Sequence, residues 1–223
     1  MVQLWEGLIN ILRDALFFFH NSIVSDYGIA IILLTVAVRL VILPLTIKQT
    51  KSMYEMQKLQ PKIKELQEKH KGNKEKLQQE MMKFYAENKV NPFGGCLPLI
   101  LQLPIIIALY RMLLGTKAII KATSFFGLLV LGTSPSTALA AGILTFVPYL
   151  VLIALMAITT YLPQRMMSTD PQQQKMGLIM VPLMVFIAWR LPAGVLVYWV
   201  TTNVWTIAQQ YVTLRLVKPA EVS

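Results

Sequence analysis

The stretch Gly28–Ile47, GIAIILLTVAVRLVILPLTI, decides how this chain folds. It is long enough to cross the apolar core of a bilayer as a helix, which takes about 20 residues, yet it contains Arg39. A guanidinium at the centre of a membrane helix costs roughly 2.5–3.5 kcal/mol on insertion scales. Arginine cannot lose its proton to avoid that cost, so it almost always faces a bundle interior or a water-filled cavity. We therefore expect Arg39 to be functional; a structural role, hydrogen-bonded to buried carbonyls, is the alternative.

The composition of the whole chain indicates a membrane protein. Of its 223 residues, 55% are hydrophobic and only 14% are charged, with a mean hydropathy of +0.55. That is too apolar for a soluble domain of this size. The single cysteine, Cys96, excludes an internal disulfide and cannot form a zinc site alone. We expect neither a metal nor a cofactor.

The apolar runs predict an all-α membrane protein with five transmembrane helices. These lie at about 27–47, 97–114, 143–162, 176–191 and 195–214. The last two are separated only by a turn at Pro192–Gly194. The run Phe125–Leu131 is too short to span as a helix, so we expect a re-entrant or interfacial piece there. Residues 1–22 predict an amphipathic helix at the extracytosolic membrane surface, with a packed extramembrane helix as the alternative.

The segment 49–90 predicts a cytosolic helical hairpin inside the core domain, 23–217. Apolar residues recur at helical spacing from Met56 to Leu66, the pattern breaks at Lys71–Asn73, and it resumes at Leu77. Pro61 predicts either a bend or the start of the first helix. Between Lys48 and Lys89 stand 11 lysines against six glutamates. This bias suits a cytosolic loop that obeys the positive-inside rule, or one beside anionic lipid or a nucleic-acid-rich partner.

The basic residues also predict an orientation. If the N-terminus is outside, the cytosolic segments hold 15 Lys and Arg residues and the outside segments hold five. We therefore expect the N-terminus outside and the C-terminus inside. The chain then ends in a short tail, 218–223.

Several motifs resemble the YidC/Oxa/Albino family of membrane insertases. They include Asn91-Pro92-Phe93-Gly94-Gly95-Cys96-Leu97-Pro98, followed by Gln102-Leu103-Pro104 and Leu109-Tyr110; Leu59-Gln60-Pro61-Lys62 in the hairpin; and Leu196-Val197-Tyr198-Trp199 with Asn203 and Gln209 in the last span. Arg39 matches the family's groove arginine. The resemblance covers about Ser22 to Val217, in the right order.

The resemblance implies a membrane protein insertase and chaperone with a hydrophilic groove, open to the cytosol and to lipid and closed toward the outside. Its location would be the bacterial plasma membrane, in a multi-pass arrangement. Its partners would be nascent membrane-protein clients, membrane lipids, the ribosome and the Sec translocon, and not DNA. Ribosome contact lacks the support of a long basic tail here.

The residues themselves suggest which side chains would do this work. For the client-binding groove we expect Arg39, Gln102, Thr160, Gln164, Tyr198, Trp199 and Asn203. For client or ribosome contact on the hairpin we expect Met56, Lys58, Lys62, Lys64, Met81 and Lys83. No carboxylate occurs within any predicted span, so an Arg39 without an ion-pair partner would attract an acidic or polar client segment. Asn203 suits interhelical bonding as well as client contact.

Two other classes of function compete with an insertase. Proline-broken helices and an intramembrane arginine also occur in small transporters and anion channels, but the spans show no internal repeat. An enzyme is not expected, because the aspartates and histidines lie outside the apolar runs and no catalytic pair or His-Glu-x-x-His motif occurs in them. A scaffold for assembling other membrane proteins is a further alternative.

Overall fold

The computed structural model describes residues 2–88, 97–115, 124–167 and 171–217. The predicted tail, 218–223, and the motif residues Asn91–Cys96 lie outside these ranges. The regular secondary structure of the described residues is helical except for one two-stranded ribbon. The elements are α1 (Val2–Ser22), α2 (Tyr27–Val41), α3 (Leu43–Lys69), α4 (Lys74–Glu87), α5 (Leu97–Gly115), β1 (Ser124–Phe125), β2 (Leu129–Val130), α7 (Pro135–Ala141), α8 (Ile143–Met167), α9 (Pro171–Ala188) and α10 (Ala193–Val217).

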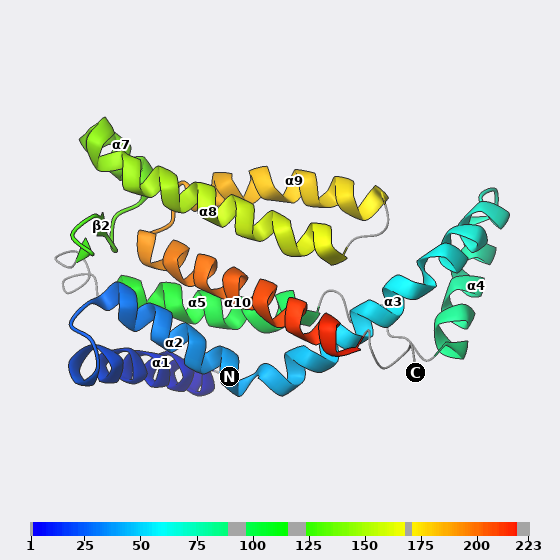
Figure 1. Ribbon diagram of the computed structural model, residues 1–223, viewed down its shortest axis with the longest axis horizontal. Helices are drawn as coiled ribbons and strands as arrows, with labels where there is room; N and C mark the ends of the chain where they lie inside the picture. The colour runs from blue at the N-terminus through cyan, green and yellow to red at the C-terminus, as the bar shows by residue number, and fades with distance from the viewer. Residues whose placement is uncertain (1, 89–96, 116–123, 168–170, 218–223) are drawn as a thin grey trace.

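Five helices form the bundle that carries the site. Figure 1 shows α2, α5, α8, α9 and α10 running alternately in one direction and the other along the long axis of the molecule. α10 lies among them and packs on α8, α2, α3 and α5. The first residues of α10, Ala193–Tyr198, are among the most buried, none more than 3% exposed where a value is given. The tightest part of the core therefore lies where α10 begins.

The first apolar stretch is broken rather than continuous. The sequence predicts one span over 27–47, but α2 ends at Val41 and α3 begins at Leu43, with a bend of 68° between them. Pro44 explains the break: it has no N–H to donate, and its ring clashes with the carbonyl of the residue four positions earlier. A proline is tolerated in the first turn of a new helix, which is where Pro44 lies in α3.

The hairpin forms, but its first arm is longer than expected. α3 continues from the bend to Lys69 and α4 follows from Lys74 to Glu87, while residues 89 and 90 are not described. Pro61 lies inside α3 and does not start it. The turn falls where the sequence predicts it, and the Asn73 side chain caps α4 by accepting a hydrogen bond from the Lys76 backbone N–H at 3.0 Å.

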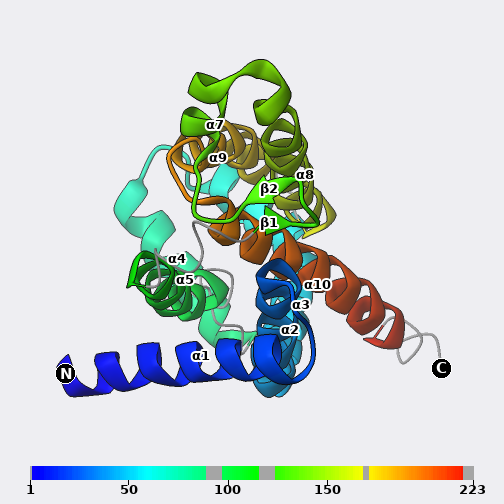
Figure 2. The same cartoon turned by 90° about the vertical axis from the view of Figure 1, so that its left-hand side faces the viewer.

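One end of the bundle is covered by β1, β2 and α7, which we call the cap. The run Phe125–Leu131, for which the sequence predicts a re-entrant or interfacial piece, contributes to this antiparallel ribbon, with Phe125 opposite Leu129. Its turn uses positive φ angles at Phe126 (50°) and Gly127 (72°). Figure 2 looks at this end and shows the ribbon between α8 and the start of α2.

The N-terminal helix α1 packs on α2 and α5 and lies crosswise to the bundle (Figure 2). Ile9, Leu12 and Leu16 form its buried stripe. Ile11 and Phe18 remain 67% and 58% exposed. α1 is thus packed against the bundle and also presents apolar side chains outward.

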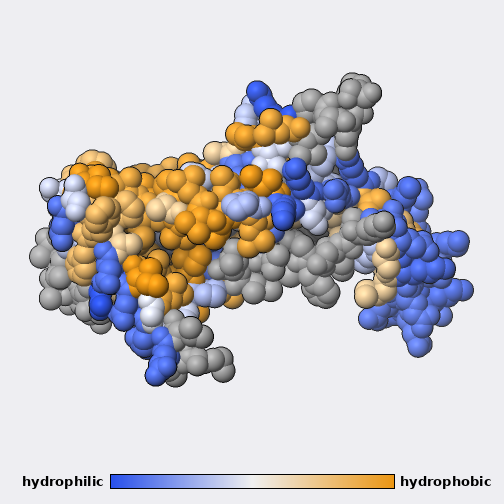
Figure 3. Space-filling view, turned by 90° about the horizontal axis from the view of Figure 1, so that it is seen from below, coloured by the Kyte–Doolittle hydropathy of each residue, from blue (hydrophilic) through white to orange (hydrophobic). Residues whose placement is uncertain are grey.

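The surface of the bundle is largely apolar. In Figure 3 hydrophobic residues cover much of the visible bundle, and the hairpin forms a hydrophilic lobe at one end. Within the described residues, Ile143–Met166 is by itself long and apolar enough to cross a membrane, with a mean hydropathy of 2.2. The bent pair α2 and α3 would add a second, whereas Gln102–Met112 and Leu178–Ala188 are shorter apolar helices. Only 33% of an 18-residue apolar part of this helix is buried, so most of that part faces outward, as a lipid-facing helix does.

Candidate functional site around Arg39

Arg39 lies in the last turn of α2, just before the bend. Its Nη2 donates a hydrogen bond of 3.3 Å to Oε1 of Gln102 on α5. The Nε2 of the same Gln102 donates a 2.6 Å bond to the Tyr198 hydroxyl on α10. Three residues that the sequence assigns to one groove are therefore joined in a chain of hydrogen bonds across three helices.

Most N–H groups of the Arg39 guanidinium make no hydrogen bond to described residues. It carries five N–H groups, and within the described part of the chain one hydrogen bond, the long bond to Gln102, engages it. The ion pairs between described residues, Arg13 with Asp14 and Arg111 with Glu6, do not involve Arg39. The side chain is half-buried, neither sealed in the core nor fully exposed. A cation in this position can still bind an acidic or polar group.

Packing loosens at the level of Arg39. On α2, buried residues extend from Tyr27 to Thr35, and those that follow are half-buried or exposed. On α10, the continuous buried run ends at Tyr198, and the residues buried farther along are the separate positions Thr202, Gln210 and Thr213. Both helices thus have a continuous buried run toward the cap and no such run toward the hairpin. This gradient is what a groove closed at the cap end requires.

Two other predicted groove residues form a separate cluster on the α8 side of α10. Asn203 Nδ2 donates to the Thr160 hydroxyl at 2.9 Å and to the Thr159 hydroxyl at 3.3 Å. These bonds tie α10 to α8, the interhelical role that the sequence left open for Asn203. The structure brings Thr160 and Asn203 together, but no hydrogen bond among the described residues joins them to Arg39.

Gln164 and Trp199 complete the predicted set. Gln164 is half-buried on α8, about one turn beyond Thr160. Trp199 is half-buried and packs against the hydrophobic core. The predicted groove residues are therefore distributed over two faces of α10, with Arg39, Gln102 and Tyr198 as the connected group.

The hairpin residues lie outside the bundle, as their sequence pattern predicts. Lys58, Lys62 and Lys83 are exposed, and Met56, Lys64 and Met81 are half-buried. The Lys58 ammonium lies 4.8 Å from the centre of the Tyr54 ring, a cation–π contact. The sequence pattern did not single out Met82 as a contact residue of the hairpin, and its side chain is 59% exposed. Burial raises the pKa of the half-buried Tyr85 above its usual value of 10.0, so its phenol stays neutral at physiological pH.

Two further polar features were not predicted as parts of the site. Gln209 on α10 donates from Nε2 to the Thr46 hydroxyl at 2.8 Å and accepts from the Trp205 indole at 3.1 Å, which links α10 to α3. Gln49 on α3 is only 5% exposed, and neither polar atom of its side chain has a partner among the described residues. A buried amide without a partner costs at least about 1–3 kcal/mol, so this position favours water or a polar segment.

The described residues contain no group of three or more His, Cys, Asp or Glu side chains that could hold a metal ion. The site offers a cation, amides and hydroxyls, which bind and orient polar groups. It does not bring together a nucleophile and a base.

Comparison with known proteins places the chain in a family. Residues 18–220 match the model of the family described as "60Kd inner membrane protein". A "Membrane protein insertase YidC" of Caldanaerobacter subterraneus subsp. tengcongensis is 39% identical over 207 residues, which are 93% of this chain and 94% of that protein. The protein of the same name from Geobacter sulfurreducens is 38% identical over 94% of this chain, but the chain spans only 38% of its length.

A solved structure agrees with these relatives. The "Active YidC insertase crystal structure with the first transmembrane domain resolved" superimposes with a TM-score of 0.72 and 27% identity, over 94% of this chain and 46% of that one. The resemblance predicted from the sequence motifs is confirmed. This chain belongs to the 60Kd inner membrane protein family, the family of the YidC membrane protein insertases.

Proposed function

We propose that this chain inserts newly made membrane proteins through a polar groove centred on Arg39. The observation that carries the proposal is the Arg39–Gln102–Tyr198 chain at the level where packing loosens. The polar segment of a client enters beside Arg39, while its apolar segment passes into lipid. Strong apolar residues contribute about −0.3 to −0.6 kcal/mol each on insertion scales, so partitioning of the client drives the step without ATP.

The short length of α2 supports a lowered hydrophobic barrier to the passage of the client's polar segment. α2 has 15 residues, or about 22 Å at 1.5 Å per residue, which is less than the roughly 30 Å thickness of the hydrocarbon core. α8, with 25 residues, reaches about 37 Å. Water that enters from the hairpin side up to the end of α2 would leave a thinner apolar layer for the client to cross. The unpartnered amide of Gln49 is consistent with such water.

The proposed setting is the bacterial plasma membrane, with α2, α5, α8, α9 and α10 as spans, the N-terminus outside and the hairpin in the cytosol. In this orientation α1 lies at the outer surface and the lysines of the hairpin obey the positive-inside rule. The exposed lysines and Met82 of the hairpin suit first contact with a client, a ribosome or the Sec translocon. Methionine supplies an adaptable apolar surface for such contacts.

The test is insertion in reconstituted vesicles by the Arg39→Ala and Arg39→Lys variants. At about 4 Å and an effective dielectric constant of about 20, a charge pair is worth roughly 4 kcal/mol. Losing it should lower insertion of clients with charged tails by at least about tenfold, since about 1.4 kcal/mol corresponds to tenfold. Lysine keeps the charge but not the fork of donors, so Arg39→Lys should restore part of the activity.

The exposed Arg111, at the other end of the bundle, provides the matched control. Arg111→Ala should insert clients at the normal rate, because its partner is Glu6 on α1. Full insertion by Arg39→Ala would contradict the electrostatic role. The rival function, a small transporter or anion channel, predicts solute flux through vesicles that contain the protein but no client.

A further inference from the structure

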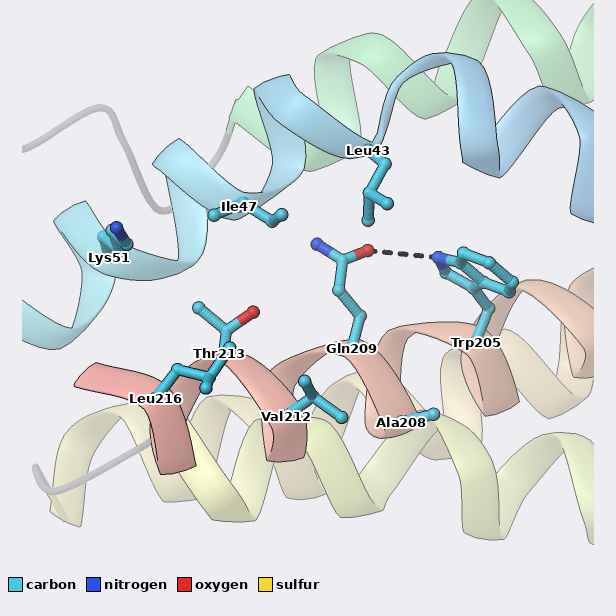
Figure 4. A pocket seen from close by; sticks show the side chains of 9 residues that line it. All are labelled: Leu43, Ile47, Lys51, Trp205, Ala208, Gln209, Val212, Thr213 and Leu216. Carbon is cyan, nitrogen blue, oxygen red and sulfur yellow. Dashed lines mark hydrogen bonds between the residues drawn. The ribbon is translucent and has the colours of Figure 1, made fainter. Parts of the chain in front are cut away.

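A second site lies at the hairpin end of the bundle, between α3 and the C-terminal half of α10. It is a pocket of about 400 Å³, within the range of small-molecule sites. Figure 4 shows the side chains that line it: Leu43, Ile47 and Lys51 from α3, and Trp205, Ala208, Gln209, Val212, Thr213 and Leu216 from α10. Arg39, Gln102 and Tyr198 are not among them.

The wall of this pocket is mainly apolar, and the Gln209 amide that belongs to it is already hydrogen-bonded. Gln209 accepts from the Trp205 indole at 3.1 Å and donates to the Thr46 hydroxyl at 2.8 Å. The wall therefore offers mainly aliphatic groups and an indole ring, with the Thr213 hydroxyl as a further polar group (Figure 4). Lys51 is exposed and lies at the end of the pocket nearest the hairpin (Figure 4), so a cation stands beside an apolar cavity.

The pocket is continuous with the apolar outer surface. Two of its lining residues on α10, Val212 and Leu216, are 54% and 73% exposed. Val41, two residues before the lining residue Leu43, is 79% exposed. The exposed Arg215 lies on the same turn of α10, with its guanidinium 4.4 Å from the Tyr211 ring centre. A ligand can thus enter sideways from the bilayer, at a level where basic side chains gather.

We propose that this pocket binds an anionic phospholipid, with an acyl chain in the cavity and the phosphate at Lys51. The apolar wall matches a hydrocarbon chain and the lysine matches the negative headgroup, because basic residues at a membrane surface attract anionic lipids. A helix is about 10–12 Å across with its side chains, so a pocket of this size suits a narrow acyl chain better than a client helix. Assignment to the cytosolic leaflet rests on the orientation proposed above.

The 68° bend between α2 and α3 gives the site its place in the fold. It turns Leu43 and Ile47 away from the direction of α2, and these side chains form the α3 wall of the cavity. A lipid bound here would brace the base of the hairpin arm against α10. The site is therefore an attachment point for lipid beside the element that receives clients.

Trp205 provides the reporter for the test, because it lines the pocket. The full chain is placed in phosphatidylcholine vesicles that contain brominated phosphatidylglycerol or, in a parallel sample, brominated phosphatidylcholine. The quenching of Trp205 fluorescence is obtained as the difference between the fluorescence lost by the full chain and that lost by its Trp205→Phe variant. We expect the anionic quencher to be more effective by up to about fivefold, the preference that one basic residue near a surface can supply.

Three variants separate a site from general charge attraction. Lys51→Glu should abolish the preference for phosphatidylglycerol. Lys48→Glu makes the same charge change one turn away at a residue outside the pocket and should keep it. Ala208→Phe fills the cavity and should reduce quenching by both lipids.

Equal quenching by the two lipids, unaffected by Ala208→Phe, would overturn the proposal. Loss of quenching when a stalled client is added, with no effect of Lys51→Glu, would assign the pocket to the client instead. All of these measurements read lipid contact and not insertion. An inactive insertase with a normal lipid preference would contradict the proposed function alone.

Discussion

The two ends of this bundle are held in different ways. At the cap end, backbone hydrogen bonds join segments far apart in sequence: Ala193 N–H donates to the Thr133 carbonyl and Gly194 N–H to the Leu131 carbonyl, both at 2.9 Å. At the hairpin end, α4 has no buried residue and packs on α3, which in turn packs on α10, α2, α5 and α8. One end is tied together by main-chain bonds, and the other is attached through a single helix.

Further contacts reinforce the cap. The Tyr149 hydroxyl on α8 accepts from the Val130 N–H at 3.0 Å and donates to its carbonyl at 3.2 Å. Asp26 uses one carboxylate oxygen to cap α2 and the other to accept from the Phe126 N–H at 3.1 Å. The cap thus fastens α2, α8 and α10 at one level. The difference between the ends teaches that an end joined by main-chain hydrogen bonds and an end attached through one helix can share one bundle.

The largest expected effect on the cap comes from Gly28→Leu. A Cβ at this position would overlap the Phe125 ring, so the ring must move and the ribbon with it. Overpacking of this kind costs about 1–3 kcal/mol, and we expect a lower melting temperature for the whole bundle in detergent. Phe125→Ala in the same chain should recover part of the loss; a double variant no more stable than Gly28→Leu would contradict the close packing.

A smaller effect is expected from Asp26→Ala, which removes the cap of α2 and its bond to the ribbon. Loss of a helix N-cap costs about 0.5–2 kcal/mol. Hydrogen exchange should accelerate at the backbone amides of Gly28, Ile29 and Phe126, which donate to this carboxylate. Asp14→Ala, at an exposed carboxylate on α1, is the control, and equal exchange in the two variants would show that Asp26 does not join α2 to the cap.

The smallest global effect is expected from Asn73→Ala in the hairpin turn. It removes the cap of α4, worth about 1 kcal/mol locally, but α4 buries no residue in the bundle. Exchange should increase in α4 while the melting temperature of the bundle stays the same. A fall in melting temperature as large as that of Asp26→Ala would mean that the stability of the bundle depends on the hairpin, and it would contradict the difference between the two ends.

Much of the helical architecture could be predicted from residue patterns. The expected end of the first helix near Ser22 agrees with α1, and the expected starts at Leu97 and Ile143 agree with α5 and α8. Long apolar or amphipathic runs specify helices strongly. The break at Ile42 was missed although Pro44 signalled it, since the apolar run continues through the bend. The ribbon in the cap was missed because strands of two residues carry no periodicity to detect.

The site was predicted in kind but not in arrangement. An arginine in an apolar run is costly wherever the helix lies, so Arg39 was identifiable without coordinates. Its hydrogen-bonded neighbours could not be identified in the same way, because Gln102 is 63 residues and Tyr198 is 159 residues farther along the chain. Polar residues in the other spans were all candidates for contact, and helix packing alone selected Gln102 and Tyr198 for Arg39 and paired Asn203 with Thr160.

The sequence by itself determined that this chain belongs in a membrane, that one of its apolar stretches carries a permanent charge and that a basic hairpin follows that stretch. These follow from local composition and periodicity, which act whatever the partners of each segment are. Only the tertiary structure decided which end of the bundle is joined by main-chain hydrogen bonds, which polar side chains meet Arg39 and where α3 and α10 form a pocket. Such features depend on the relative rotation and depth of helices distant in sequence, which no single segment specifies.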